Sequence, residues 1–559
     1  MTHRKKFPGA AFALACAMSF CTPAFAGQPA SQAATTGSVD RAQLLAARQA
    51  AVDRAMALIE GPARKLVHRA AGDAFAADPA AVQIDADGTE HVRFTRTYRD
   101  GIPMIGGDFV LHSRDGRVLG ASQTLRTSWR PELAPHVASA QATEVALERF
   151  EATRTRPPAA RLVLYVRDGR PRLAHEVSVE GVRADQTPSD MRFFVDAGNG
   201  RILDGWDGVQ TAGPGGNGPD CADATPSEGI GRSLNLGTVA IDTVACRHGY
   251  QLMDLSRGGS HVLNMGLRWR PDGVPFSDAD NTWGNGWLDD AATAAVDAHV
   301  GIAATWDYFK DAHGRLGIAD DGIGTVGRVH FGTGYENAFW QDRCFCITFG
   351  DGDNGVYTFP LVAIDVAAHE MSHGVTSRTA GLVYSGESGA LNEATSDIFG
   401  TLVEFHVGHG EDQGDYLIAE NIYPGDSPLR YMFKPSLDNR SFDCYVPGIG
   451  GVDVHFSSGI ANHFFYLLAE GAVVPEGFGE DGTGLVPGDL VCNGDTSIEG
   501  IGRDAAGAIW YRALTVYMTS LTDYAGARVA TLAAAGDLYG AGSQEQDAVA
   551  AAWGAVLVF

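Results

Sequence analysis

Two histidines four residues apart carry the clearest chemical signal of the sequence. His369 and His373 enclose Glu370 in the segment His-Glu-Met-Ser-His. Residues four apart on a helix share one face, so both imidazoles can bind one metal ion while Glu370 lies beside it as a non-ligand. Two ordinary helix histidines around a surface glutamate would produce the same letters. The pattern alone therefore makes a metal site only a hypothesis. Such a site would need a third ligand.

A second pair of polar residues supplies that ligand. Glu393 and Asp397 lie four apart in Gly-Ala-Leu-Asn-Glu-Ala-Thr-Ser-Asp, a segment that begins at Gly389 and is predicted to be helical. One carboxylate can complete a set of two histidines and a glutamate, which leaves a fourth position for water as in catalytic zinc sites. The other can accept the free ring N–H of a ligand histidine and orient it. Two solvated acids are the alternative, but the apolar neighbours of the pair favour a buried role.

The elements around these residues predict an α+β protein. Short strands and Gly/Asp turns dominate 220–360, with one helix near 290–313, whereas long helical patterns dominate 361–559. These helices are expected at 364–377, 390–407, 457–471, 505–521, 525–538 and 545–556. A strand-rich lobe (212–380) followed by a helical lobe (381–559) predicts a cleft between them.

The charge of the chain changes along its length. The net charge is −26, from 42 Lys+Arg and 68 Asp+Glu, and counting residues 1–211 gives 26 and 23, which leaves 16 and 45 for the remainder. This balance makes nucleic acid an unexpected partner and cations expected ones. A basic pro-segment that docks on an acidic body and a merely solvated acidic surface explain the asymmetry equally well. The Gly/Pro-rich stretch 211–219 lies where the charge changes and is predicted to be a linker.

The first 26 residues are typical of an export signal. A basic start is followed by a short apolar stretch and by a small-x-small cleavage site that ends at Ala26. A lipoprotein signal at Cys16 is the weaker alternative, because little apolar length precedes that cysteine. No apolar run approaches the roughly 20 residues of a membrane-spanning helix. We therefore expect a secreted, extracellular protein that is not held in a membrane.

The segment 27–211 is predicted to be a pro-region. One helix is expected over 27–70, and a helix-plus-sheet pattern then occurs twice, at about 75–130 and 135–207. No cluster of candidate catalytic residues occurs in it.

Six cysteines remain after removal of the signal, and an even number in an exported chain favours disulfides. Fifteen pairings are conceivable. Separation along the chain alone suggests Cys221–Cys246 and Cys444–Cys492. Cys344 and Cys346 are ambiguous, because neighbouring strand positions of that kind share a face but seldom form a bridge.

At this point the chain resembles the thermolysin family of zinc metalloproteases with a pro-region, and in particular its pseudolysin- and vibriolysin-like branch. The motif His369–His373 with Glu393 and Asp397 is joined, in order, by further similar stretches. These are 336–340, which is similar to the substrate-edge strand, the Gly-Asp-Gly-Asp turn at 350–353, the second catalytic segment at 453–462, the C-terminal helices from 500 to 545, and the pro-segments at 91–125 and 161–205. The resemblance covers nearly the whole chain.

The resemblance implies roles for the central residues. His369, His373 and Glu393 would hold one catalytic zinc ion, and Glu370 would act as general base and then as proton shuttle to the leaving amine. A carboxylate beside an acidified water can take its proton.

Three further residues are implied to stabilise the oxyanion. His455 and Tyr384 would donate to it, and Asp453 would orient His455. Asp453 lies two residues before His455 as in the pseudolysin-like branch, whereas the thermolysin branch has its acid farther upstream, where this chain has Gly450.

Substrate contacts are implied as well. Asn337 and the backbone of Ala338 would hold the peptide as an additional strand, and Arg430 would bind a substrate carbonyl. An apolar pocket that selects cleavage on the amino side of bulky hydrophobic residues would be lined by Leu361, Val366, Ile418, Ile422 and Leu429, whose alternative role is simple core packing.

Calcium is the second implied cofactor. Asp365, Glu404 and Asp415 match calcium-binding positions, with the carbonyl of Leu417 nearby and Glu420 as a further candidate. Leu417 replaces an acid of the two-calcium relatives, which favours one ion over two. Asp278-Ala-Asp280 resembles a third, weaker site, for which a solvated acidic turn is an equally good interpretation.

The sequence thus predicts a two-lobed zinc endopeptidase made as a zymogen. Its pro-region would be an intramolecular chaperone and inhibitor that is cut near 205–220 by the protein itself, its substrates would be proteins and peptides, and a monomer is expected. A catalytically silent, calcium-stabilised binding or adhesion module and a zinc hydrolase of another bond are the alternatives.

Overall fold

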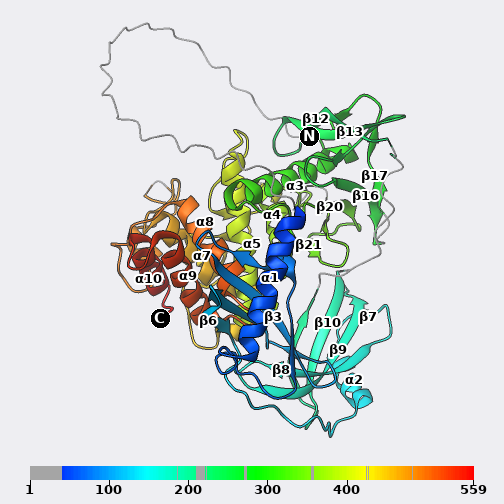
Figure 1. The fold of residues 1–559 in the computed structure, drawn as a ribbon. Coiled ribbons are helices and arrows are strands. Elements are labelled where there is room, and N and C mark those ends of the chain that lie inside the picture. Colours follow the sequence, from blue (N-terminus) through cyan, green and yellow to red (C-terminus); the bar gives the residue numbers. More distant parts are fainter. Residues whose placement is uncertain are drawn as a thin grey trace. The chain divides into compact units, whose positions relative to one another are not determined.

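The computed structural model describes residues 41–184, 187–208, 221, 223–269, 273–353, 355, 358–423, 425, 427–480 and 482–559. The predicted export signal and linker lie outside these residues, as does the first part of the helix expected over 27–70. Residues 45–559 form one compact unit. Figure 1 shows the elements of the described chain coloured along the sequence.

The pro-region is built on one mixed sheet. Its main path is β11-β10-β9-β8-β4-β3-β5-β6, and the two repeated units meet where β4 and β8 pair in parallel, Met104 opposite Leu164 and Ile105 opposite Tyr165. The strands are β1 (Asp73–Ala76), β2 (Gln83–Ile84), β3 (Thr89–Tyr98), β4 (Ile102–Ile105), β5 (Phe109–Arg114), β6 (Arg117–Gln123), β7 (Thr153–Arg154), β8 (Ala159–Val166), β9 (Pro171–Val182), β10 (Pro188–Asp196) and β11 (Ile202–Asp207).

Each unit carries a helix on its part of the sheet. Apolar residues of α1 (Arg41–Glu60) enter one core with residues of β3 and β5, and those of α2 (Ser139–Leu147) enter another with residues of β9 and β10. The helix expected to reach residue 70 ends at Glu60, because Gly61 and Pro62 follow and proline lacks the N–H that would continue the helix. The turn Leu66–His68 still contributes Val67 to the first core.

Two sheets form the strand-rich lobe. The first has the order β18-β14-β13-β12-β19 and the second β15-β16-β20-β22-β21, with β17 paired to β16. The helix α3 (Ala291–His313) begins at Asp290, whose side chain caps the Ala292 N–H. The strands are β12 (Thr225–Arg232), β13 (Thr238–Cys246), β14 (Gly249–Gln251), β15 (Met253–Asp254), β16 (Ser260–Arg268), β17 (Val274–Pro275), β18 (Ser277–Asp278), β19 (Thr282–Trp283), β20 (Val326–Phe331), β21 (Ala338–Gln341) and β22 (Cys346–Phe349).

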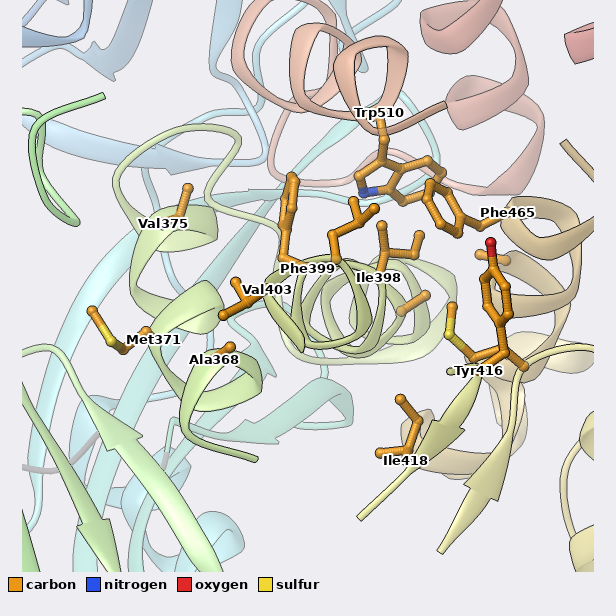
Figure 2. Close-up of a cluster of buried hydrophobic side chains, with 14 of the residues drawn as sticks. Ala368, Met371, Val375, Ile398, Phe399, Val403, Tyr416, Ile418, Phe465 and Trp510 are labelled. Atoms are coloured by element: carbon orange, nitrogen blue, oxygen red, sulfur yellow. The ribbon is translucent and has the colours of Figure 1, made fainter. Parts of the chain in front are cut away.

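The second lobe is mainly helical and is centred on α5 (Gly386–Val407), which packs against α4 (Ile364–Ser377). Figure 2 shows this core: Ile398, Phe399 and Val403 of α5 lie between Trp510 and the apolar side chains of α4. The remaining elements are β23 (Leu417–Ile418), β24 (Arg430–Tyr431), α6 (Val454–Ser457), α7 (Gly459–Glu470), α8 (Arg503–Arg512), α9 (Tyr524–Tyr539), α10 (Gln544–Ala555) and the short helical turns η1 (Pro79–Ala81), η2 (Glu420–Ile422), η3 (Pro435–Asp438), η4 (Ile449–Gly451), η5 (Pro487–Leu490) and η6 (Ala513–Tyr517). The α+β expectation is confirmed.

Three disulfides join the cysteines of the catalytic part. Cys221–Cys246 and Cys444–Cys492 confirm the two suggested pairs. Cys344 and Cys346, whose pairing the sequence left ambiguous, are bonded to each other with 5.2 Å between their Cα atoms. Cys344 belongs to the turn before β22 and not to a strand, so the rule for strand neighbours does not apply.

Candidate metal centre and active-site cleft

Two helices bring the three predicted ligands together. His369 and His373 lie on consecutive turns of α4, and their Nε2 atoms are 3.2 Å apart. Glu393 comes from α5, and each of its carboxylate oxygens lies 3.5 Å from the Nε2 atom of one histidine. The α4–α5 packing in the core therefore places three donor groups around one point.

The donor set fits a zinc ion. Its ligand atoms all lie within 4.8 Å of one another. The Oε2 atom of Glu393 is buried and has no hydrogen-bond partner among the described residues, which is costly for a carboxylate unless a cation satisfies it. Two imidazoles and one carboxylate form the ligand set of several catalytic zinc enzymes.

Each histidine is oriented by a second side chain. His369 Nδ1 lies 2.8 Å from Asp397 Oδ1, and His373 Nδ1 lies 2.7 Å from Asn392 Oδ1. Both partners are acceptors here, so each Nδ1 carries the proton and each Nε2 is free to coordinate. The sequence predicted the first contact and missed Asn392, although its position next to Glu393 was a usable signal.

Asp397 is itself held by two groups from the helical lobe. Arg430 donates to it through Nε at 2.9 Å and Nη2 at 2.6 Å, and Asn462 donates at 2.7 Å. Burial would raise the pKa of Asp397, but the Arg430 guanidinium and His369 hold it well below its usual value. Arg430 also lines the cavity described below, and its expected contact with a substrate carbonyl stays a prediction.

Tyr384 and His455 converge on the open side of the same centre. The Tyr384 hydroxyl donates to Glu393 Oε1 and lies 3.2 Å from His455 Nε2. His455 Nδ1 lies 2.8 Å from Asp453 Oδ1. The charge of Glu393 raises the pKa of His455, and the hydrogen bond to Asp453 adds to this shift. The Tyr384 hydroxyl and the His455 ring thus both lie beside Glu393, with 3.7 Å between His455 Nε2 and Glu393 Oε1.

These groups line a cavity of about 1110 Å³. Glu370 lines it and is buried. Asn337 and Ala338 lie on its wall, and β21, which begins at Ala338, is the last strand of its sheet. The predicted pocket residues line the same cavity: Leu361, Val366, Ile418, Ile422 and Leu429.

Part of the cavity wall comes from the pro-region. Glu180, Arg183 and Asp190 of the β9–β10 hairpin and Trp206 and Asp207 of β11 line the cavity that contains the metal ligands. The pro-region is therefore placed in the cleft of the described chain.

A second cluster of carboxylates lies at the far end of α5. Glu404, Asp415 and Glu420 place oxygen atoms within 4.8 Å of one another. Burial raises the pKa of Glu404 well above its usual value and that of Glu420 to about 9, and neighbouring acids, Asp365 first, add to both shifts. Glu404 Oε1 and Glu420 Oε2 are buried without a hydrogen-bond partner in the part of the chain that the structure describes. Such crowding of oxygens suits a hard divalent cation.

Asp412 belongs to this cluster and was missed by sequence reasoning. It is buried, and its charge acts on Asp365, Glu404 and Glu420. It was not among the positions that matched the family in the sequence. Asp278, in contrast, accepts hydrogen bonds from the Asp280 and Thr282 N–H groups, as expected of an acidic turn.

Comparison with known proteins gives consistent similarities. Family models described as thermolysin metallopeptidase, catalytic domain, and thermolysin metallopeptidase, alpha-helical domain, match residues 228–377 and 380–558. A model of the fungalysin/thermolysin propeptide motif matches residues 81–125.

Individual relatives are similar over most of the chain. A thermolysin from Alicyclobacillus acidocaldarius is 36% identical over 499 residues, which cover 85% of each chain. The transglutaminase-activating metalloprotease of Streptomyces mobaraensis is 45% identical over 482 residues, 85% of this chain but 60% of that protein. Among solved structures, the precursor of protealysin from Serratia proteamaculans is 29% identical and covers 54% of this chain and 87% of its own, with a TM-score of 0.41. In the described residues, no helix has the length and apolar character needed to cross a membrane.

Proposed function

The chain belongs to the thermolysin family of metallopeptidases, and on this premise we propose how its residues hydrolyse a peptide bond. It is a thermolysin-like neutral metalloendopeptidase made with a propeptide. The observation that carries this function is the convergence of His369, His373 and Glu393 in a cavity that Glu370 also lines.

The three convergent side chains would hold the catalytic zinc ion. When bound, zinc polarises the scissile carbonyl and brings the pKa of a coordinated water to about 7. Asp397 and Asn392 keep His369 and His373 in the tautomer that leaves Nε2 unprotonated.

Glu370 handles the proton. It follows His369 on α4 and lines the cavity that contains the metal ligands, so its carboxylate would act beside them without belonging to them. It takes the proton of the attacking water on a carboxylate oxygen and passes it to the leaving amine, so that no proton needs to come from bulk solvent.

Tyr384 and His455 stabilise the negative oxygen that forms on the scissile carbon. The Tyr384 hydroxyl and the protonated Nε2 of His455 point to the same place, and each such donor contributes about 3 kcal/mol to transition-state stabilisation. Asp453 fixes the His455 ring. This contact also supports placement in the pseudolysin-like branch, although the relatives described above are thermolysins and the Streptomyces protease.

Substrate would lie along the open edge of β21. Asn337 and the Ala338 backbone bind the peptide as an additional strand, and Arg430 binds a carbonyl of it. The apolar residues Leu361, Val366, Ile422 and Leu429 would accept the side chain after the scissile bond, so cleavage on the amino side of bulky hydrophobic residues is expected.

Calcium would occupy the second carboxylate cluster. We assign Asp365, Glu404, Asp415 and the Leu417 carbonyl as ligands, keep Glu420 as a further candidate and add Asp412. One ion at this cluster is proposed, with a structural role because it lies at the end of α5 opposite to Glu393.

The pro-region would assist folding, cover the cleft and be removed by self-cleavage near 205–220, a segment largely outside the described residues. The mature protein would be secreted and act as a monomer on proteins and peptides.

A peptide library with mass-spectrometric detection tests this function. The processed enzyme should cleave before bulky hydrophobic residues, and a chelator should abolish cleavage. Glu370→Ala should abolish cleavage while zinc stays bound. Cleavage that persists in this variant, or activity only on bonds other than peptide bonds, would contradict the proposal.

A further inference from the structure

The turn Val383–Gly386 connects α4 to α5 and carries Tyr384. The Val383 N–H donates to the Ser520 carbonyl at 2.8 Å, and the Ser385 N–H donates to the Val383 carbonyl at 2.8 Å. Gly386 has a φ of +61°, which favours glycine. The position of the Tyr384 hydroxyl therefore depends on a short turn that is fixed to the segment around Ser520.

One end of this turn contacts the second unit of the pro-region. Ser385 Oγ donates to Asp204 Oδ1 at 3.2 Å, while Asp204 Oδ2 accepts from Tyr165 and Arg167. Arg167 lies so close to Gly386 that a Cβ atom there would be 2.3 Å from its Nη2. The pro-region thus packs directly on the turn.

The other end is reached through Ser520 by the first unit of the pro-region. Asp108 accepts from the Ser520 N–H at 3.0 Å and from its hydroxyl. Arg93 donates to the Met518 carbonyl at 2.8 Å, so the contact extends along the segment. Since Ser520 in turn binds Val383, Asp108 acts on the turn through one intervening residue.

The two carboxylates are shielded from water. The Asp108 and Asp204 side chains are 16% and 8% exposed. Their partners in the catalytic part are hydroxyl and N–H groups, not cations. Attraction between a basic pro-region and an acidic body therefore does not explain these contacts. They are hydrogen bonds from neutral groups to a carboxylate and depend on how the donors are positioned.

We propose that Asp108 and Asp204 hold the Val383–Gly386 turn from both ends, and that loss of the pro-region releases this turn and the Tyr384 hydroxyl. In this way the pro-region would fix the position of the Tyr384 hydroxyl, which is proposed to stabilise the oxyanion, while it also covers the cleft. The inference rests on the proposed roles of the pro-region and of Tyr384. It adds the residues through which the pro-region acts on Tyr384.

Hydrogen exchange followed by mass spectrometry tests the contact on the full-length chain. Glu370→Ala serves as background, since it prevents self-cleavage. In Asp108→Asn/Asp204→Asn, the amides of Val383, Ser385 and Ser520 should exchange about tenfold faster or more, because the variant replaces two charged hydrogen-bond acceptors by weaker, neutral ones. Asp168→Asn is the matched control: Asp168 is 76% exposed and pairs only with Arg172 of the pro-region among the described residues.

A second pair of variants covers the case in which the aspartate variants do not fold. Ser385→Ala/Ser520→Ala removes the hydroxyls from the catalytic part and should give the same faster exchange. Unchanged exchange in a folded double variant would overturn the proposal. The exchange experiment uses the inactive Glu370→Ala background, so its result does not depend on peptide cleavage. A failed cleavage assay of the processed enzyme would therefore not change the outcome of the exchange experiment.

Discussion

At the residue scale, the metal centre is a layered hydrogen-bond network. The spacing of His369, His373, Glu393 and Asp397 is local to two helices and could be recognised in the sequence. The contact of Arg430 with Asp397 could not, because its two residues are 33 positions apart and meet only through tertiary packing. Asn462 joins the same carboxylate from α7.

This network should set the metal affinity. Asp397→Asn replaces the charge that orients His369, so zinc affinity should fall about 10- to 100-fold. Competition with a chelator of known affinity measures this change. Asp311→Asn, on the exposed surface of α3, is the control and should leave the affinity unchanged. Equal affinities of the two variants would contradict the assigned role of Asp397.

Asp453 should act on catalysis and not on binding. Asp453→Asn removes the negative charge that faces His455 Nδ1 and favours the protonated ring, so kcat should fall about tenfold or more with little change in KM, since the donor acts on the transition state. Steady-state kinetics on a peptide substrate, with zinc content measured in parallel, provide the test. A rise in KM at constant kcat would assign Asp453 to substrate binding instead.

At the element scale, the helical patterns predicted most of the second lobe, and the departures have local causes. The helix expected over 457–471 corresponds to α7, and the short helix α6, capped by the Asp453 side chain, directly precedes it. The helix expected over 505–521 is α-helical only as far as Arg512. Beyond that residue the chain forms the π-helical turn η6. Asp412 and the Cys344–Cys346 bridge depend on loop conformations for which the sequence carries no periodic signal.

The calcium ion proposed for the carboxylate cluster at the end of α5 should make the stability of the protein depend on calcium. Without the ion, Glu420 has a folded-state pKa of about 9, above its usual 4.5, so its contribution to the unfolding free energy is lost as pH rises between these values. Calcium at 100 times its Kd should add about 2.7 kcal/mol and flatten this dependence.

Thermal unfolding across pH, with and without calcium and at verified zinc content, measures the effect. Glu420→Gln should show a smaller loss of stability with rising pH in the calcium-free state. Melting curves that do not respond to calcium at any pH would contradict a cation at this cluster.

At the scale of the whole molecule, the contacts between the pro-region and the catalytic part do not follow the net charges. Arg48 pairs with Asp320 as the charge asymmetry suggests, but Arg512 and Arg343 of the catalytic part pair with Asp85 and Glu180 of the pro-region. The net charge of a segment therefore could not predict which of its residues make the contacts.

The precursor should lose stability in acid through His112. Burial, the largest cause, and the nearby charges of His91, Arg512 and Arg93 together lower its pKa to about 3, against a smaller opposing effect of Asp85. A depressed histidine pKa stabilises the fold above about pH 6.5, and this contribution is lost as pH falls toward 3. The ring also lies 5.1 Å from that of Tyr517 in the catalytic part.

Urea unfolding of the full-length chain at several pH values tests this expectation in the Glu370→Ala background. His112→Gln should be about 1 kcal/mol less stable at pH 7, because it loses the hydrogen bonds to His91 and Ser122. Its stability should also fall less between pH 6.5 and 4. Parallel pH profiles of the two proteins would rule out His112 as the source.

The metal content of the purified, processed enzyme tests the central claim most directly. Elemental analysis should find one zinc per active chain, and His369→Ala, His373→Ala and Glu393→Gln should each lose most of it. An active wild-type enzyme without stoichiometric zinc, or variants that retain a full equivalent, would contradict the account.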